Sequence, residues 1–203
     1  MKTDPFSDSW AFLLGNTPDH GRLGAGRYAL VALFAGLLIA SAVIARAAWR
    51  RDPLQRTAAD LWTWLFRVLM GSMWFQGAIW KLPLPVSGGL QYWTEQMAGN
   101  AAFSFYAALV RDLLLPNMAI FNPLVLAAEL GFAVSLILGI AVRPIAAVGA
   151  LYALGLWIGL YRHPAEWPWI YIFIAIAHGQ FAVYQAGRSL GLDGLRRPVG
   201  SRA

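Results

Sequence analysis

The chain contains no cysteine and few charged residues. The absence of cysteine excludes disulfides, thiol relays, cysteine-ligated iron–sulfur clusters and zinc–cysteine sites. Only 13% of the 203 residues are charged, whereas 59% are hydrophobic. Because a water-soluble domain rarely carries so much apolar surface, the composition predicts an integral membrane protein. The net charge of +6 is then typical of basic membrane-flanking loops, so we expect no nucleic-acid partner.

Histidine is scarce as well, which limits the metal and haem chemistry that the chain can support. His20 and His163 fall in polar segments, and only His178 lies inside an apolar run. A bis-histidine haem needs two such residues, so we expect no haem, iron–sulfur cluster or metal. The sequence also lacks a glycine-rich nucleotide loop and a nucleophile constellation.

Long apolar runs are the dominant feature that is present. Five of them approach or reach the roughly 20 helical residues that cross a hydrocarbon core, at residues 28–45, 61–80, 124–142, 145–161 and 167–187. The predicted fold is all-α, a membrane bundle of five helices. The acidic N-terminus has no apolar run long enough for a signal peptide.

Basic residues predict the orientation. Nine arginines occupy the connections on one side of the predicted bundle, at positions 46, 50, 51, 56, 143, 188, 196, 197 and 202. The opposite side carries six basic residues in much longer segments. The denser side is expected to be cytoplasmic. This predicts an inner-membrane protein with its N-terminus outside and its C-terminus inside.

The predicted outer loop, residues 82–123, is rich in aromatic and aliphatic side chains. Asn100 is a candidate cap for a helix that runs to about Leu115 and stops at Pro116. Apolar positions 103, 106, 110, 113 and 114 share one face of that helix. Two interpretations stay open and are compatible: a helix that lies on the outer leaflet, or a lid over a pocket between the spans.

Ionisable residues inside membrane spans are costly unless paired or hydrated, so each one is a candidate site residue. Helical rise places Gln76, Lys81 and Glu129 in an outer layer, and Arg67 and His178 in an inner layer. These polar positions are the sequence's candidates for chemistry.

Each of these residues has a structural interpretation beside the functional one. Glu129 either pairs with Lys81 or Arg67 to hold the bundle together, or handles protons or a ligand. Lys81 either extends to the outer headgroups or turns toward Glu129. Arg67 is interpreted as reaching the cytoplasmic phosphates, and His178 as a hydrogen-bonded core residue rather than a ligand.

Three motifs occur in order along the chain: GSMWFQGAIWKLPLP from position 71, NPLVLAAELGFAVSLILGIAVRPIAAVGAL from position 122, and AGRSLGLDGLRR from position 186. Their order and spacing resemble the DoxX/DoxD family of small membrane proteins over about residues 58–197. The resemblance implies a four-helix membrane core at residues 58–197, to which this chain adds one extra N-terminal transmembrane helix at 28–49. Residues 1–27 are then an extramembrane segment and residues 198–203 a tail. The family includes the small subunit of thiosulfate:quinone oxidoreductase. Arg67, Lys81, Glu129 and Arg143 match its recurring polar positions, and Asp193 matches its closing turn.

The resemblance leads to an expected function, a membrane subunit of a redox complex that holds a quinone near the outer leaflet. Lys81 and Glu129 are the expected catalytic residues. The expected cofactor-binding residues are Gln76, Trp80, Trp74, Arg67 and His178. Two alternatives stay open: a non-catalytic accessory subunit that docks on a larger membrane complex or on copies of itself, and a small-solute or proton transporter.

Overall fold

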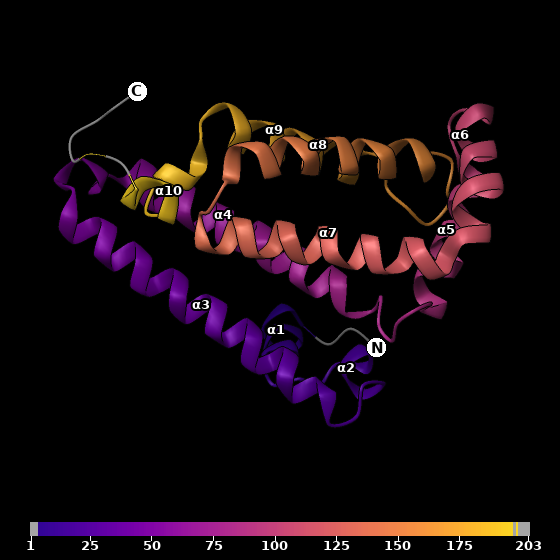
Figure 1. Cartoon of the computed structure of the whole chain (residues 1–203), viewed down its shortest axis with the longest axis horizontal. Coiled ribbons are helices and arrows are strands. Elements are labelled where there is room, and N and C mark those ends of the chain that lie inside the picture. The colour runs from indigo at the N-terminus through magenta and orange to yellow at the C-terminus, as the bar shows by residue number, and fades with distance from the viewer. Residues whose placement is uncertain (1–3, 197, 199–203) are drawn as a thin grey trace.

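The computed structural model of the chain describes residues 4–196 and residue 198, and all regular structure in this part is helical (Figure 1). The long helices are α3 (Gly26–Arg51), α4 (Ala58–Ile79), α7 (Met118–Leu138), α8 (Val142–Gly159) and α9 (Trp169–Val183). The short helices are α1 (Pro5–Leu13), α2 (Pro18–Gly21), α5 (Gly88–Asn100), α6 (Ser104–Leu109) and α10 (Leu192–Leu195). The all-helical prediction is therefore confirmed for the described residues.

In the described part of the chain, three helical runs are long and apolar enough to cross a membrane: α3, the run Ser104–Leu138 that contains α6 and α7, and α8. The apolar helix α9 spans 15 residues, and α4 carries Asp60 and Arg67 along its 22 residues. The fold is thus that of a helical protein with membrane-spanning character. The arrangement of four core spans plus one stays a prediction.

The predicted outer loop is mostly helical. The helix expected up to about Leu115 is present from Ser104, but its expected cap at Asn100 and its expected stop at Pro116 are wrong. Asn100 ends α5, and its side-chain amide donates to the Gln96 carbonyl oxygen at 2.8 Å instead of capping a following helix. After α6 come a π-helical turn, Val110–Leu114, and a 3₁₀ turn, Leu115–Asn117. Pro116 lies in this 3₁₀ turn, where it removes a backbone donor and favours a bend between α6 and α7 (Figure 1).

The third predicted span begins earlier than expected. Helix α7 starts at Met118, so Pro123 lies inside the helix. The span was expected from position 124, one residue after this proline. The helix ends at Leu138, and Gly139 then adopts a left-handed conformation with φ of +69°, which glycine reaches without the steric penalty of a side chain.

Helices α4 and α7 pack along each other, as do α8 and α9. Glycines permit the close approach: a Cβ atom on Gly71 of α4 would lie 2.8 Å from Ile137 Cγ1 of α7. Gly149 of α8 similarly lies directly against the imidazole ring of His178 of α9. In lipid, where apolar burial between helices gains little, such close packing contributes much of the association.

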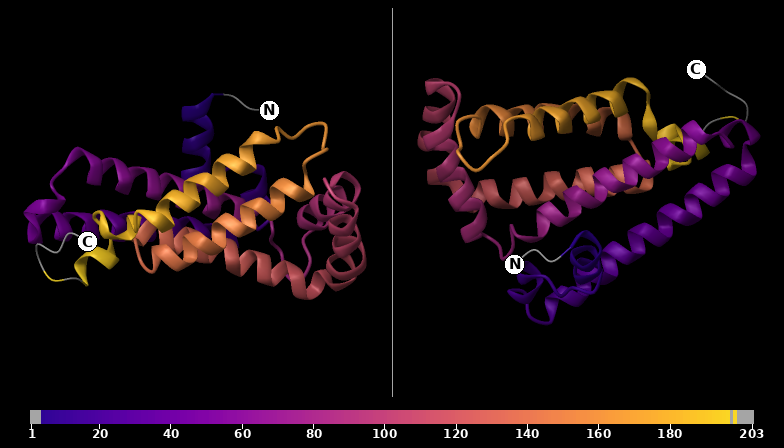
Figure 2. Two further views of the ribbon diagram at one scale, coloured as in Figure 1. Left: turned by 90° about the horizontal axis from the view of Figure 1, so that it is seen from above. Right: turned by 180° about the vertical axis from the view of Figure 1, so that it is seen from behind.

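The two ends of the bundle differ. At one end lie the C-terminus of α3, the turn between α7 and α8, and α10 (Figure 1). At the other end α5 and α6 lie across the long helices in all three ribbon views (Figures 1 and 2). The short helices α1 and α2 lie beside the N-terminal part of α3, where Phe12 packs edge-to-face on Phe34. The end covered by α5 and α6 holds the candidate site.

Candidate functional site

Lys81 directly follows α4 and turns back toward it. Its backbone N–H donates to the Ala78 carbonyl oxygen at 3.2 Å, which tightens the end of the helix. Its ammonium Nζ donates to the Gly77 carbonyl oxygen at 2.7 Å and lies 3.7 Å from the centre of the Trp80 ring. The residue as a whole is only 3% exposed. Lys81 is therefore directed into the protein, and its extension to outer headgroups is contradicted.

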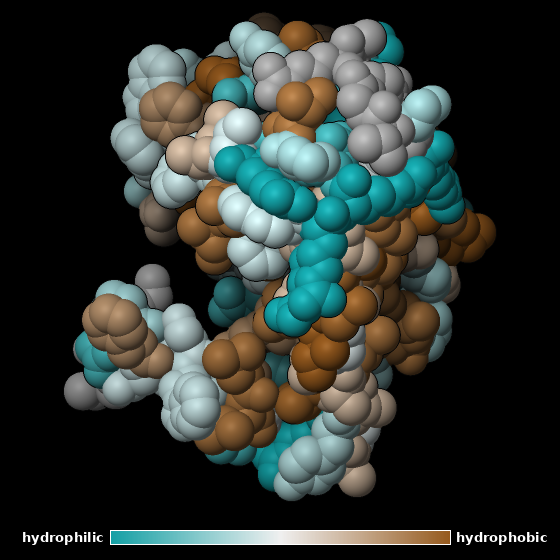
Figure 3. Space-filling view, turned by 90° about the vertical axis from the view of Figure 1, so that its left-hand side faces the viewer, coloured by the Kyte–Doolittle hydropathy of each residue, from teal (hydrophilic) through white to brown (hydrophobic). Residues whose placement is uncertain are grey.

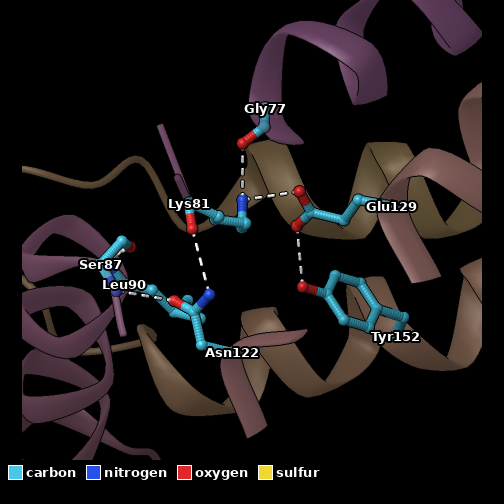
Figure 4. Close-up of polar contacts among 7 residues, drawn as sticks. All are labelled: Gly77, Lys81, Ser87, Leu90, Asn122, Glu129 and Tyr152. Atoms are coloured by element: carbon cyan, nitrogen blue, oxygen red, sulfur yellow. Dashed lines mark hydrogen bonds and ion pairs between the residues drawn. The ribbon is translucent and has the colours of Figure 1, made fainter. Parts of the chain in front are cut away.

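Asn122 holds the backbone around Lys81 in place. Its amide Nδ2 donates to the Lys81 carbonyl oxygen at 3.0 Å, and its Oδ1 accepts from the Ser87 N–H at 3.1 Å (Figure 4). Because Asn122 belongs to α7 and Ser87 caps α5, one buried side chain joins three elements. The position of Lys81 is thus determined by the fold.

Glu129, on α7, is the ion-pair partner of Lys81. Its Oε2 lies 2.6 Å from Lys81 Nζ, and its Oε1 accepts a hydrogen bond of 2.8 Å from the Tyr152 hydroxyl on α8 (Figure 4). Both charged side chains are 4% exposed. A buried pair retains its charges only when further polar groups complete its hydrogen bonding. Gly77 and Tyr152 supply those groups here.

A cavity of about 550 Å³ lies beside this pair, within the range of about 300–1,000 Å³ typical of small-molecule sites. Its walls come from α4, α5, α6, α7, α8 and α9, and most of the side chains are apolar or aromatic. The aromatic members include Trp74, Trp80, Trp93, Tyr106 and Phe121. Because α5 and α6 contribute to the walls, the predicted outer segment covers part of this cavity.

Several polar groups meet in the cavity, and they differ in how fully they are already bonded. Thr94 donates to the Leu90 carbonyl oxygen at 2.7 Å, and the Tyr171 hydroxyl donates to Glu166 Oε2 at 3.0 Å. The Tyr106 hydroxyl makes no hydrogen bond to any described residue, and the Lys81 ammonium uses two of its three donors on oxygen atoms. Two donors therefore stay available to a ligand.

An aromatic layer closes the inner side of the cavity. Trp74, which lines the cavity, packs edge-to-face on Phe132 and Tyr152 with ring centres 5.2 and 5.5 Å apart. The Trp74 indole N–H donates to His178 Nε2 at 2.7 Å. His178 is fully buried behind this layer and does not line the cavity. His178 is therefore a hydrogen-bonded core residue, which is the structural interpretation that the sequence favoured.

Arg67 lies apart from the cavity. Its guanidinium Nη1 donates to the carbonyl oxygens of Leu136 and Ile137 at the C-terminal end of α7, where the helix dipole favours a cation. The side chain is fully buried. The expectation that Arg67 extends to membrane phosphates is wrong, because these carbonyl groups bind the cation inside the protein.

The structure brings together four of the seven predicted site residues, Lys81, Glu129, Trp74 and Trp80, at one cavity. The side chain of Gln76 is exposed on the surface of α4 and does not line the cavity. Of the three residues assigned to the outer layer, Lys81 and Glu129 therefore line the cavity and Gln76 does not.

Tyr152, Asn122 and Tyr106 were missed as site residues. Tyr152 lies in an apolar run, where its ring is part of the hydrophobic pattern and only its hydroxyl gives a polar signal. Asn122 was noticed as part of the Asn-Pro motif, and an amide next to a proline inside an apolar segment is a usable signal for a buried polar contact.

Comparison of the chain with protein-family models, curated proteins and solved structures gave no match. The class defined by the fold is therefore a helical protein with membrane-spanning character and an internal apolar cavity beside a buried ion pair. Any more specific assignment depends on the residues themselves.

Proposed function

We propose that the protein is a membrane subunit of a redox complex and that the cavity beside Lys81 and Glu129 binds the head of a quinone. The single observation that carries the proposal is the joining of an apolar, aromatic-lined cavity of about 550 Å³ to a buried Lys–Glu–Tyr cluster. A quinone needs an apolar, flat-walled space for its ring and donors for its two carbonyl oxygens. The DoxX/DoxD resemblance points to the same ligand class.

The proposed contacts follow from the available donors. One quinone oxygen would accept from the Lys81 ammonium, and the other from the Tyr106 hydroxyl, while Trp80 and Trp93 would flank the ring. Reduction to the quinol takes two electrons and two protons. The Lys81 ammonium would give the first proton, and its ionised partner Glu129, hydrogen-bonded to Tyr152, would take up protons from water and pass them on.

The electrons would come from a partner protein. The chain has no cysteine and a single histidine inside its predicted spans, so its own residues offer no evident electron carrier. The proposal therefore includes a larger membrane complex at the bilayer, oriented with the basic end of the bundle in the cytoplasm.

The accessory-subunit alternative has less support from the contacts. A small-residue face is one means of docking on another membrane helix, yet Gly155 and Gly159 of α8 lie against Tyr106 and Met97 of the same chain. A transporter would need a relay of ionisable groups, for which Arg67, Glu129 and His178 are the candidates. These three side chains bind separate partners: carbonyl groups of α7, the Lys81 ammonium and the Trp74 indole, respectively.

The test is a quinone titration of the full chain in lipid nanodiscs, followed by tryptophan fluorescence, together with extraction of lipids that co-purify with the protein. Gly155 lines the cavity, and a Cβ atom there would lie 3.2 Å from the Tyr106 hydroxyl. Gly155→Leu should therefore fill part of the cavity and weaken binding of a short-chain ubiquinone or menaquinone analogue at least roughly tenfold.

The matched control is Gly131→Leu, since Gly131 lies in α7 and a Cβ atom there would meet no atom within 4 Å. It should bind like the wild type. Absence of saturable quenching in the wild-type protein, or equal affinity in both leucine variants, would contradict the proposal.

A further inference from the structure

A second cavity, of about 290 Å³, lies at the end of the bundle opposite the quinone site. It is lined by Arg143 in the first turn of α8, Gln185 and Arg188 after α9, and Asp193 and Arg196 at α10. We name it the basic cleft. The space-filling view from this end of the bundle shows hydrophilic side chains gathered beside apolar ones (Figure 3).

The segments that carry these arginines are locked together. The Asp193 carboxylate accepts from the backbone N–H groups of Ala141 and Val142 at 2.9 and 3.0 Å, while its own N–H donates to the Gly139 carbonyl oxygen at 2.8 Å. Gly139 also packs against Gly191 so closely that a Cβ atom would lie 2.6 Å from the Gly191 Cα. The backbone frame of the cleft is therefore preformed.

The charge in the cleft is unbalanced. The guanidinium groups of Arg143 and Arg196 line it beside one carboxylate, that of Asp193, and this carboxylate already accepts two backbone hydrogen bonds. Among the described residues, neither Arg143 nor Arg196 forms an ion pair with a carboxylate. Converging cations with so little local counter-charge form a site for an anion.

The geometry points to a phosphate group as the ligand: we propose that the basic cleft binds one phosphate-bearing anion. Guanidinium groups hold phosphate oxygens through paired, charge-assisted hydrogen bonds. The cleft lies where α8 begins and α9 has ended, and exposed Val148 and Val183 lie within two turns of it along these helices. Basic pockets between membrane helices bind phospholipid headgroups, and inorganic phosphate shares the same chemistry.

The test uses the full chain in a neutral detergent. Native mass spectrometry counts bound phosphatidylglycerol against phosphatidylcholine, and thermal unfolding with inorganic phosphate or with chloride at equal ionic strength examines the soluble anion. We expect one tightly held anion per chain. Arg143→Gln and Arg196→Gln should each weaken its binding about fivefold or more. Both side chains are exposed, so the variants should fold normally.

Arg111→Gln is the matched control, because Arg111 is an exposed arginine in the π-helical turn at the opposite end. Selective retention of phosphatidylglycerol identifies the lipid headgroup, whereas stabilisation by inorganic phosphate identifies the soluble anion. Equal binding by the wild type and both cleft variants, an equal loss in Arg111→Gln, or no bound anion of either kind would overturn the proposal.

Discussion

Arg67 and Lys81 are two buried cations, one within α4 and one just beyond its end, and they differ in the groups that surround them. Arg67 lies at the tightly packed end of α7, where its guanidinium binds the carbonyl oxygens of Leu136 and Ile137. Lys81 follows the C-terminal end of α4, where its ammonium binds the Glu129 carboxylate beside a cavity of about 550 Å³. Both are costly to bury, and both are almost fully enclosed.

The difference shows that burial of a charge does not by itself mark a site. Arg67 has backbone oxygens as its partners, which cannot change protonation state, and packed side chains around it. Lys81 has an ionisable partner, Glu129, which also accepts a hydrogen bond from the Tyr152 hydroxyl. The pair lies beside a cavity. Four substitutions test this contrast in order of expected effect.

Arg67→Met should cause the largest loss of stability. It leaves two buried carbonyl groups at the end of α7 without their cationic donor, at a cost of about 3–6 kcal/mol for two charge-assisted bonds. Unfolding in mixed detergent micelles measures the change. The quinone affinity of the protein that still folds should stay near the wild-type value. A large loss of affinity in the folded fraction would mean that the two regions are coupled.

Lys81→Met should cost about 3–5 kcal/mol, because it leaves the Glu129 carboxylate buried without its ion-pair partner. Unlike the Arg67 variant, it should also lower quinone affinity in the folded fraction. The same unfolding and titration experiments measure both effects. Unchanged stability would indicate that the ammonium and the carboxylate interact weakly.

Gly139→Ala should cost about 2–3 kcal/mol. The residue has φ of +69°, and a Cβ atom would lie 2.7 Å from Arg67 Nη1. The matched control is Gly179→Ala, on α9, where no atom lies within 4 Å of the added carbon. That control should be neutral or slightly stabilising. Equal effects of the two alanines would contradict the close packing at the α7–α8 turn.

Tyr152→Phe should have the smallest effect on stability, about 1 kcal/mol, because it removes one hydrogen bond to Glu129 Oε1. Quinone affinity should fall a few-fold, because the carboxylate loses a partner that orients it. Tyr184→Phe, at an exposed tyrosine after α9, is the control. If Tyr152→Phe binds quinone with wild-type affinity, the Tyr152 hydroxyl does not contribute to ligand binding.

The sequence was informative where a strong local signal existed. Continuous apolar runs correspond to the long helices, and the scarcity of lysine drew attention to Lys81. Glu129 was a candidate because a carboxylate in an apolar run must find a partner. The sequence could not decide whether Lys81 or Arg67 pairs with Glu129, because both cations belong to the same predicted segment. Only the packing of the helices in three dimensions shows that Lys81 is the partner.

The errors have identifiable causes. The segment from Asn100 to Met118 contains a break, a π-helical turn and a 3₁₀ turn, and no periodicity rule separates these from one amphipathic helix. The hydrogen bonds from Arg67 to backbone carbonyl groups could not be predicted from the sequence. Helix ends leave backbone oxygens unsatisfied, but no side chain in the sequence marks where such oxygens will lie. Helical rise gives the depth of Gln76 but not the direction of its side chain, which is exposed on α4.

The most direct test of the central claim is quinone titration of the double variant Lys81→Met/Glu129→Met. Replacement of a whole buried ion pair by apolar side chains of similar size is often neutral or stabilising. The free energy of unfolding of the variant should therefore lie within about 1 kcal/mol of the wild-type value. If the pair is a ligand site, the affinity should fall at least about tenfold. Wild-type affinity in this well-folded variant would instead show that the pair has only a structural role.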